Sequence, residues 1–112
     1  MEFYKQGIDE FLKMVEQNHF VEAHEVLEDE WKKFKKDGMK DEAKFLQALI
    51  NGATSIALWM KKRPEPSLRV CEVLQKNKHL IETINLEDRE KYLLAIKLLE
   101  DKFRQKDILE QN

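Results

Sequence analysis

The sequence predicts an all-α protein, a single domain over residues 1–112 built as a bundle of about five helices. Apolar residues recur at intervals of three and four along most of the chain, which is the spacing of one helix face. Only 3 Gly and 2 Pro are present, too few for the many turns of a β-sandwich or barrel. Because 42% of the residues are hydrophobic and 38% are charged, we expect a folded core beneath a strongly charged surface.

Interruptions of this spacing divide the chain into its helices. Asn18 is expected to cap the second helix, and Gly38 to adopt the left-handed conformation that ends it. Pro66 fits the first turn of the fourth helix, and Asn85 with Asp88 resembles a capping arrangement before the fifth. The five helices are expected at residues 2–17, 20–36, 40–61, 66–82 and 86–104.

The third helix is distinguished by its lack of charge. Residues 45–60 contain no charged side chain, in a chain that is 38% charged. Such a segment must be covered on most of its circumference, so we expect it to be the central helix of the bundle. It is short for a membrane span and carries polar side chains such as Gln47, Asn51 and Thr54, so no membrane partner is expected.

Charge and cysteine content indicate where the protein resides. The 20 Lys and Arg nearly balance the 22 Asp and Glu, which predicts no nucleic-acid partner. Cys71 is the one cysteine and is expected to be a small core residue without a disulfide. The chain also begins without the basic and apolar regions of a secretory leader. We therefore expect a cytoplasmic protein.

One polar cluster is expected between the second and third helices. His24 falls on the apolar face of the second helix, and Glu28 lies one turn further along. Gln47 and Asn51 are likewise four residues apart on the third helix. If the two helices pack together, these four side chains meet, with Trp31 as a wall of the cluster.

This cluster has a structural and a functional interpretation. In the first, His24 and Glu28 satisfy each other and fix the register of two helices. In the second, the carboxylate and the imidazole form an acid–base pair or half of a metal site. The segment from His24 to Glu28 resembles HExxH, but Glu28 stands in place of the second histidine, and Glu25 or Glu22 would have to supply a further ligand. A divalent metal at His24 and Glu28 is thus compatible with the sequence but not required by it.

Two segments, FVEAHEVLEDEW at 20–31 and FLQALINGA at 45–53, resemble domain-of-unknown-function family 309. The family pattern is E-x-H-E-x-x-E-x-x-W followed by F-L-Q-G-L-I-Q-x-A, and its members are often labelled metal-dependent hydrolases. Ala48 and Asn51 depart from this pattern, and Trp59-Met60 replaces a tyrosine–histidine pair, which removes one further ligand. The resemblance implies an all-helical fold and a polar site formed by Glu22, His24, Glu25, Glu28, Trp31, Gln47 and Asn51.

Two functions follow as hypotheses. The first is a metal-dependent hydrolase, in which Glu28 or Glu25 is the general base and His24 is a ligand or proton carrier. The alternative is a non-catalytic binding or interaction module, in which the polar network is structural. In that case an exposed apolar surface around Trp59 would recruit a protein partner, a small ligand or a second copy as a homodimer. A solvent-reachable His24–Glu28 pocket favours the first hypothesis, and a sealed network favours the second.

Overall fold

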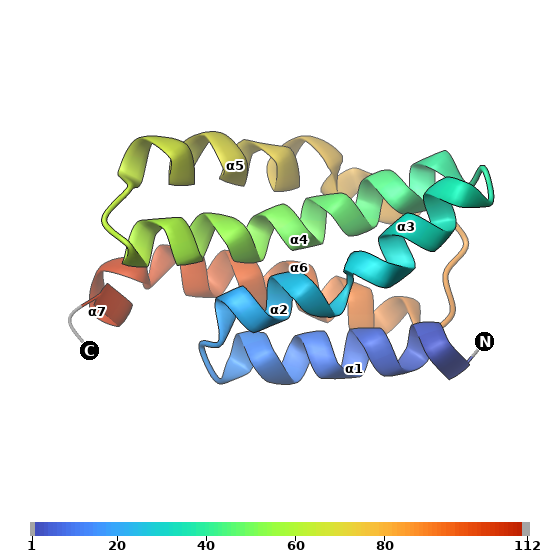
Figure 1. The fold of residues 1–112 in the computed structure, drawn as a ribbon, viewed down its shortest axis with the longest axis horizontal. Helices are drawn as coiled ribbons and strands as arrows, with labels where there is room; N and C mark the ends of the chain where they lie inside the picture. Colours follow the sequence, from blue (N-terminus) through green and yellow to red (C-terminus); the bar gives the residue numbers. More distant parts are fainter. Residues whose placement is uncertain (1, 111–112) are drawn as a thin grey trace.

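The computed structural model describes residues 2–110, with side chains from residue 7 to residue 108. The described residues form helices joined by short turns and contain no strand, so the predicted fold class is confirmed (Figure 1). Its elements are α1 (Glu2–Glu16), α2 (Phe20–Val26), α3 (Glu28–Lys36), α4 (Lys40–Met60), α5 (Pro64–Asn77), the 3-10 helix η1 (Lys78–Glu82), α6 (Arg89–Arg104) and α7 (Lys106–Glu110).

Helix α4 is the centre of the bundle, as its lack of charge predicts. It packs against α2, α3, α5 and α6, and in Figure 1 it runs between α5 on one side and α2, α3 and α6 on the other. Phe45, Leu49, Ala53 and Ile56 on this helix are fully buried. A charged side chain at such a position would lose its hydration without a partner, which explains the composition of the segment.

No helix in the described part of the chain combines the length and the apolar character needed to cross a membrane.

The first and last long helices complete the same core. Ile8 and Phe11 of α1 are fully buried, and Tyr92 and Leu99 of α6 are each only 1% exposed. Helix α1 packs directly on α6. The ring of Tyr92 meets the ring of Phe45 edge-on, with 6.1 Å between centroids. Residues from both ends of the chain therefore share one hydrophobic core.

The helix expected at 20–36 is divided into α2 and α3 at Leu27. The backbone of Leu27 has φ −93° and ψ −2°, outside the regular helical range, while its side chain is fully buried. This break lets α2 pack on both α1 and α4 while α3 continues along α4. The helix expected at 66–82 starts two residues earlier, at Pro64. It is also divided, because its C-terminal part tightens into the 3-10 helix η1.

Two expected caps are wrong, and one helix end is confirmed. Asn18 has φ +65° and closes α1, and its Oδ1 accepts a hydrogen bond of 2.7 Å from Lys102 Nζ. Asp88 also has a positive φ and makes no side-chain capping bond, so α6 begins at Arg89 instead of residue 86. Gly38 has φ +77° at the end of α3, the left-handed conformation expected there.

Candidate functional site

His24 and Glu28 form the centre of the candidate site. They stand on either side of the break at Leu27, His24 near the end of α2 and Glu28 at the start of α3. Their Nε2 and Oε1 atoms are 3.9 Å apart, and the two side chains are 36% and 34% exposed. The pair is therefore half-buried and reachable by solvent, not sealed in the core. At this separation it is an ion pair only when the imidazole is protonated.

The two amides of the expected cluster do not join this pair. Asn51 is half-buried, and its Nδ2 donates a 2.9 Å hydrogen bond to the backbone oxygen of Gln47, one turn earlier on the same helix. The side chain of Gln47 is exposed. Among the described side chains, no hydrogen bond connects either amide with His24 or Glu28. Helix α4 satisfies the Asn51 side chain locally, although α2 and α3 do pack against it as assumed.

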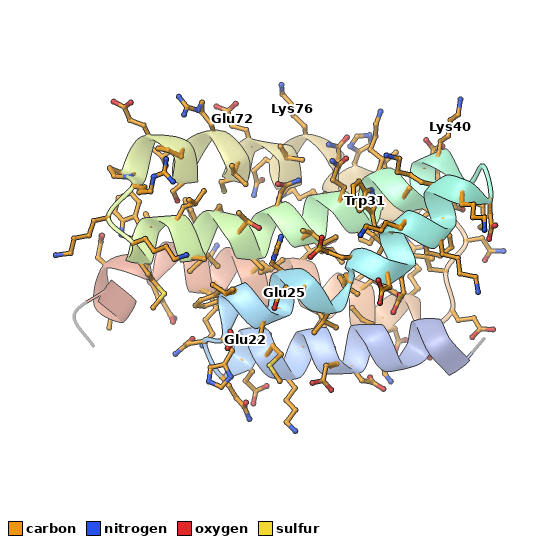
Figure 2. The ribbon with its side chains drawn as sticks, in the orientation of Figure 1. Glu22, Glu25, Trp31, Lys40, Glu72 and Lys76 are labelled. Carbon is orange, nitrogen blue, oxygen red and sulfur yellow. The ribbon has the colours of Figure 1, made fainter. Side chains whose placement is uncertain are left out.

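The other expected site residues lie towards solvent. Glu22 and Glu25 are exposed and lie on the outer side of α2 (Figure 2). Trp31 is half-buried on α3, and the ammonium group of Lys35 lies 4.9 Å from the centre of its ring. Trp31 thus makes a cation–π contact on the surface.

The surface expected around Trp59 is covered. Helix α7 packs against α4, and Lys106 Nζ lies 4.6 Å from the Trp59 ring centroid and 4.5 Å from that of Phe103. Trp59 is half-buried, and its Nε1 is buried without a hydrogen-bond partner in the described residues. The aromatic face that was expected to recruit a partner is occupied by the chain's own C-terminal helix.

The donor set at His24 does not fit a resident metal ion. A catalytic zinc centre takes three protein ligands. His24 and Glu28 supply two, and no three His, Cys, Asp or Glu side chains between residues 7 and 108 are grouped so as to hold a metal. We therefore assign no metal-dependent step to the pair.

A shallow apolar groove adjoins His24, and we call it the α2–α4 groove. It consists of two hollows of about 160 and 210 Å³ that share Phe20, Val21, Ala57 and Lys61. Val21 is 45% exposed and Met60 38% exposed, so apolar surface is open to solvent. The further lining residues are His24, Thr54 and Leu58 in the first hollow, and Asn18, His19, Glu22 and Met60 in the second.

The structure also reveals a buried carboxyl that the sequence interpretation missed. Glu30 of α3 is only 2% exposed, and its Oε2 has no hydrogen-bond partner in the described residues. Burial raises the pKa of Glu30 to about 8, so the group is mostly protonated at neutral pH. A signal existed, because Glu30 lies three residues after Leu27 and four before Phe34, on the inner stripe of the helix.

Glu30 is enclosed by α1 and α6. A Cβ atom added to Gly7 of α1 would overlap Glu30 Oε1, so the absence of a side chain at Gly7 leaves space for the Glu30 carboxyl. Burial, together with the charges of Glu30 and Asp88, raises the pKa of the Tyr92 hydroxyl on α6. Asp88 Oδ2 is a second buried oxygen without a described partner. The burial of these acidic groups without hydrogen-bond partners therefore destabilises this end of the bundle.

The fold and site define a small all-helical protein with a half-buried histidine–glutamate pair beside an apolar groove. The chain belongs to the family described as domain of unknown function (DUF309), whose model matches residues 8–70. This confirms the resemblance seen in the sequence. The matched segment includes the His24–Glu28 pair and the whole α2–α4 groove. No curated protein and no solved structure matches the chain.

Proposed function

We propose that the protein is a helical binding module, and that its α2–α4 groove takes an apolar, acidic segment of a partner protein. The observation that carries this proposal is the groove itself, where two hollows join along the same pair of helices. Phe20, Ala57 and Leu58 are among its apolar lining residues, and Val21 and Met60 expose further apolar surface. An elongated apolar surface of this kind suits the side chains of one docked segment.

The charge around the groove favours an acidic segment. Lys61 lines both hollows, and the exposed Lys62 and Arg63 follow it directly in the chain. Glu22 is the one carboxylate in the described lining. An excess of positive charge at the rim of an apolar groove attracts a partner with acidic residues beside its apolar ones.

A metal-dependent hydrolase is the second candidate, and the exposure of the His24–Glu28 pair is the observation that favours it. In that function Glu28 or Glu25 is the general base and His24 carries the proton. Only His24 and Glu28 approach each other, however, and two donors do not make a catalytic metal centre. The binding function needs no further ligand, so the geometry supports it better.

The same proposal extends to cellular context. We place the protein in the cytoplasm, as one domain over residues 1–112, with a protein or a second copy as partner and without nucleic acid. The support is compositional: one cysteine, and a formal net charge of −2.

Binding of a synthetic amphipathic peptide tests the groove. The probe has leucine on one helical face and glutamate on the other, and its binding is followed by fluorescence anisotropy. Lys61→Glu and Val21→Arg are each expected to weaken binding about tenfold, because they remove charge complementarity and apolar surface. Leu94→Arg is the matched control, because Leu94 is 53% exposed on α6, away from the groove.

Three results of this experiment would contradict the binding proposal. The first is no binding at millimolar peptide. The second is equal binding of a peptide in which lysine replaces glutamate. The third is a Val21→Arg protein that binds as well as the unmodified one.

Metal content separates the two candidate functions. We expect protein purified without chelator to hold no stoichiometric zinc or manganese by elemental mass spectrometry, and to bind neither ion tightly on titration. A near-stoichiometric metal that is lost in His24→Ala would overturn this expectation and favour the hydrolase.

A further inference from the structure

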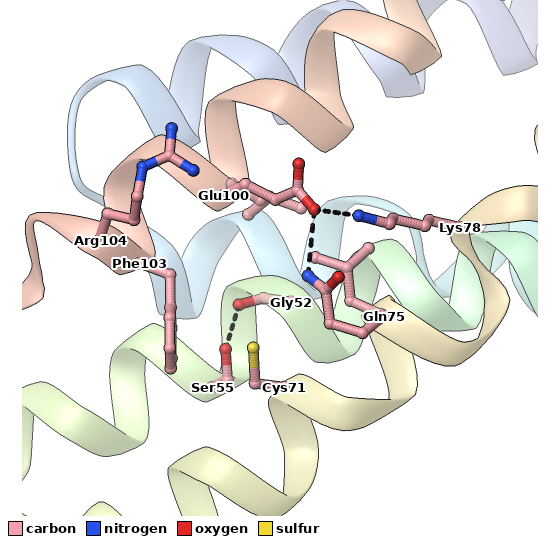
Figure 3. A pocket seen from close by; sticks show the side chains of 10 residues that line it. Gly52, Ser55, Cys71, Gln75, Lys78, Glu100, Phe103 and Arg104 are labelled. Carbon is pink, nitrogen blue, oxygen red and sulfur yellow. Dashed lines mark hydrogen bonds and ion pairs between the residues drawn. The ribbon is translucent and has the colours of Figure 1, made fainter.

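A further cavity in the described structure lies outside the candidate site. It has a volume of about 410 Å³, is open to solvent on one side and lies between α4, α5 and α6, with η1 at its edge (Figure 3). This is within the range of sites that hold small organic molecules. Of its lining residues, only Gly52 and Ser55 fall within the segment that the family model matches.

The inner part of the cavity is apolar. Leu74 and Leu99 are at most 2% exposed and line it together with the ring of Phe103. At Gly52 an added Cβ would lie 2.9 Å from Leu99 Cδ1, so the backbone of α4 forms part of the floor. The Ser55 hydroxyl donates a 2.7 Å hydrogen bond to the Gly52 oxygen. The proton of the Ser55 hydroxyl is thus already engaged.

The rim of the cavity is polar and carries more positive than negative charge. Lys78 Nζ and Gln75 Nε2 donate hydrogen bonds of 2.6 and 3.0 Å to the same oxygen of Glu100 (Figure 3). Burial acts to raise the pKa of Glu100, but these bonds and the Lys78 charge outweigh it and hold the pKa below its usual value. Glu100 is therefore ionised. It is the one acidic residue in the described lining, which also includes two cationic residues, Lys78 and Arg104.

We infer that this cavity binds a small organic anion. Its apolar or aromatic body lies against Leu74, Leu99 and Phe103, and its carboxylate, sulfonate or phosphate group lies at the rim between Lys78 and Arg104. An ammonium group has three donors and a guanidinium group five. Each cation therefore keeps donors for an anion after pairing with Glu100 or, for Arg104, with Asp101. This inference does not depend on the proposed function of the α2–α4 groove.

Cys71 provides a reporter inside the cavity. It is the one cysteine of the chain, and it is half-buried in the lining beside Ser55, not enclosed in the core as the sequence suggested. Burial raises the pKa of its thiol, so it should react slowly and without competition from another thiol. A ligand that fills the cavity must cover it further.

The test uses 8-anilinonaphthalene-1-sulfonate as the anionic aromatic probe and neutral iodoacetamide as the thiol reagent. At about ten times the Kd, about one-tenth of the cavities stay free, so the alkylation rate of Cys71 should fall about tenfold. Lys78→Met should raise the Kd about tenfold by removing a cation at the rim. Glu100→Gln should lower the Kd, because it frees Lys78 from its partner.

Matched controls define the outcome. Lys76→Met removes an exposed lysine that points away from the bundle on α5 (Figure 2) and should leave the Kd unchanged. The neutral analogue N-phenyl-1-naphthylamine should bind more weakly than the sulfonate. Probe fluorescence that saturates without slowing Cys71 alkylation would overturn the inference, as would equal Kd values for Lys78→Met and Lys76→Met. Circular dichroism establishes that each variant is folded.

Discussion

Replacing Glu30 by glutamine is expected to remove most of the decline in folding stability between pH 5 and pH 8. The pKa of Glu30 is about 8 in the folded chain against an ordinary value of 4.5. Between these values the unfolded chain loses the proton while the folded chain keeps it, so the free energy of unfolding falls as pH rises. Above about pH 8 both states are ionised and the loss is complete, on the order of 3–5 kcal/mol.

Urea unfolding followed by circular dichroism from pH 5 to pH 9 measures this effect. Glu72→Gln is the matched control, because Glu72 is exposed on the outer side of α5 and should keep the pH dependence of the unmodified protein (Figure 2). The two variants differ only at positions 30 and 72, so the comparison isolates Glu30. A Glu30→Gln protein with the same pH dependence as Glu72→Gln would contradict a buried, protonated Glu30.

Replacing Gly7 by alanine is expected to destabilise the fold by about 1–3 kcal/mol through overpacking. In a helix interior alanine is favoured over glycine by about 1 kcal/mol, so a loss of stability runs against intrinsic propensity. The reason is that the new Cβ would overlap Glu30 Oε1. To accommodate it, the Glu30 carboxyl must leave its buried position, or the helices around it must shift.

A double-mutant cycle with Glu30→Ala checks this explanation. When the carboxyl is absent, Gly7→Ala has space for its methyl group and should become neutral or stabilising. The two substitutions are therefore expected to be strongly non-additive in chemical denaturation. If Gly7→Ala stabilises the unmodified protein, the Glu30 carboxyl does not occupy the space beside Gly7.

Much of the fold was accessible from hydrophobic spacing alone. The helix expected at 40–61 is observed as Lys40–Met60, because its uncharged segment has no stable position other than the centre of a bundle. The division at Leu27 was not predicted, since neither glycine nor proline marks it. It arises from the packing of α2 on α1 and α4, which is a tertiary effect.

The candidate site was predicted less completely. The approach of His24 to Glu28 follows from their spacing of four residues. Asn51 was misplaced because an amide can also bond to the backbone of its own helix. Glu30 was overlooked, although its register on the expected helix pointed inwards. The cavity beside Cys71 is lined by residues as far apart in the sequence as Gly52 and Glu100, so no local sequence pattern predicts it.

The family model covers a smaller part of the chain than the hydrophobic core does. The matched segment ends at residue 70, yet α6 contributes Tyr92 and Leu99 to the same core as Phe11 of α1. The segment that the family model matches is thus shorter than the part of the chain that forms the hydrophobic core. The α2–α4 groove lies wholly within the recognised part, whereas the cavity is walled mainly by later residues.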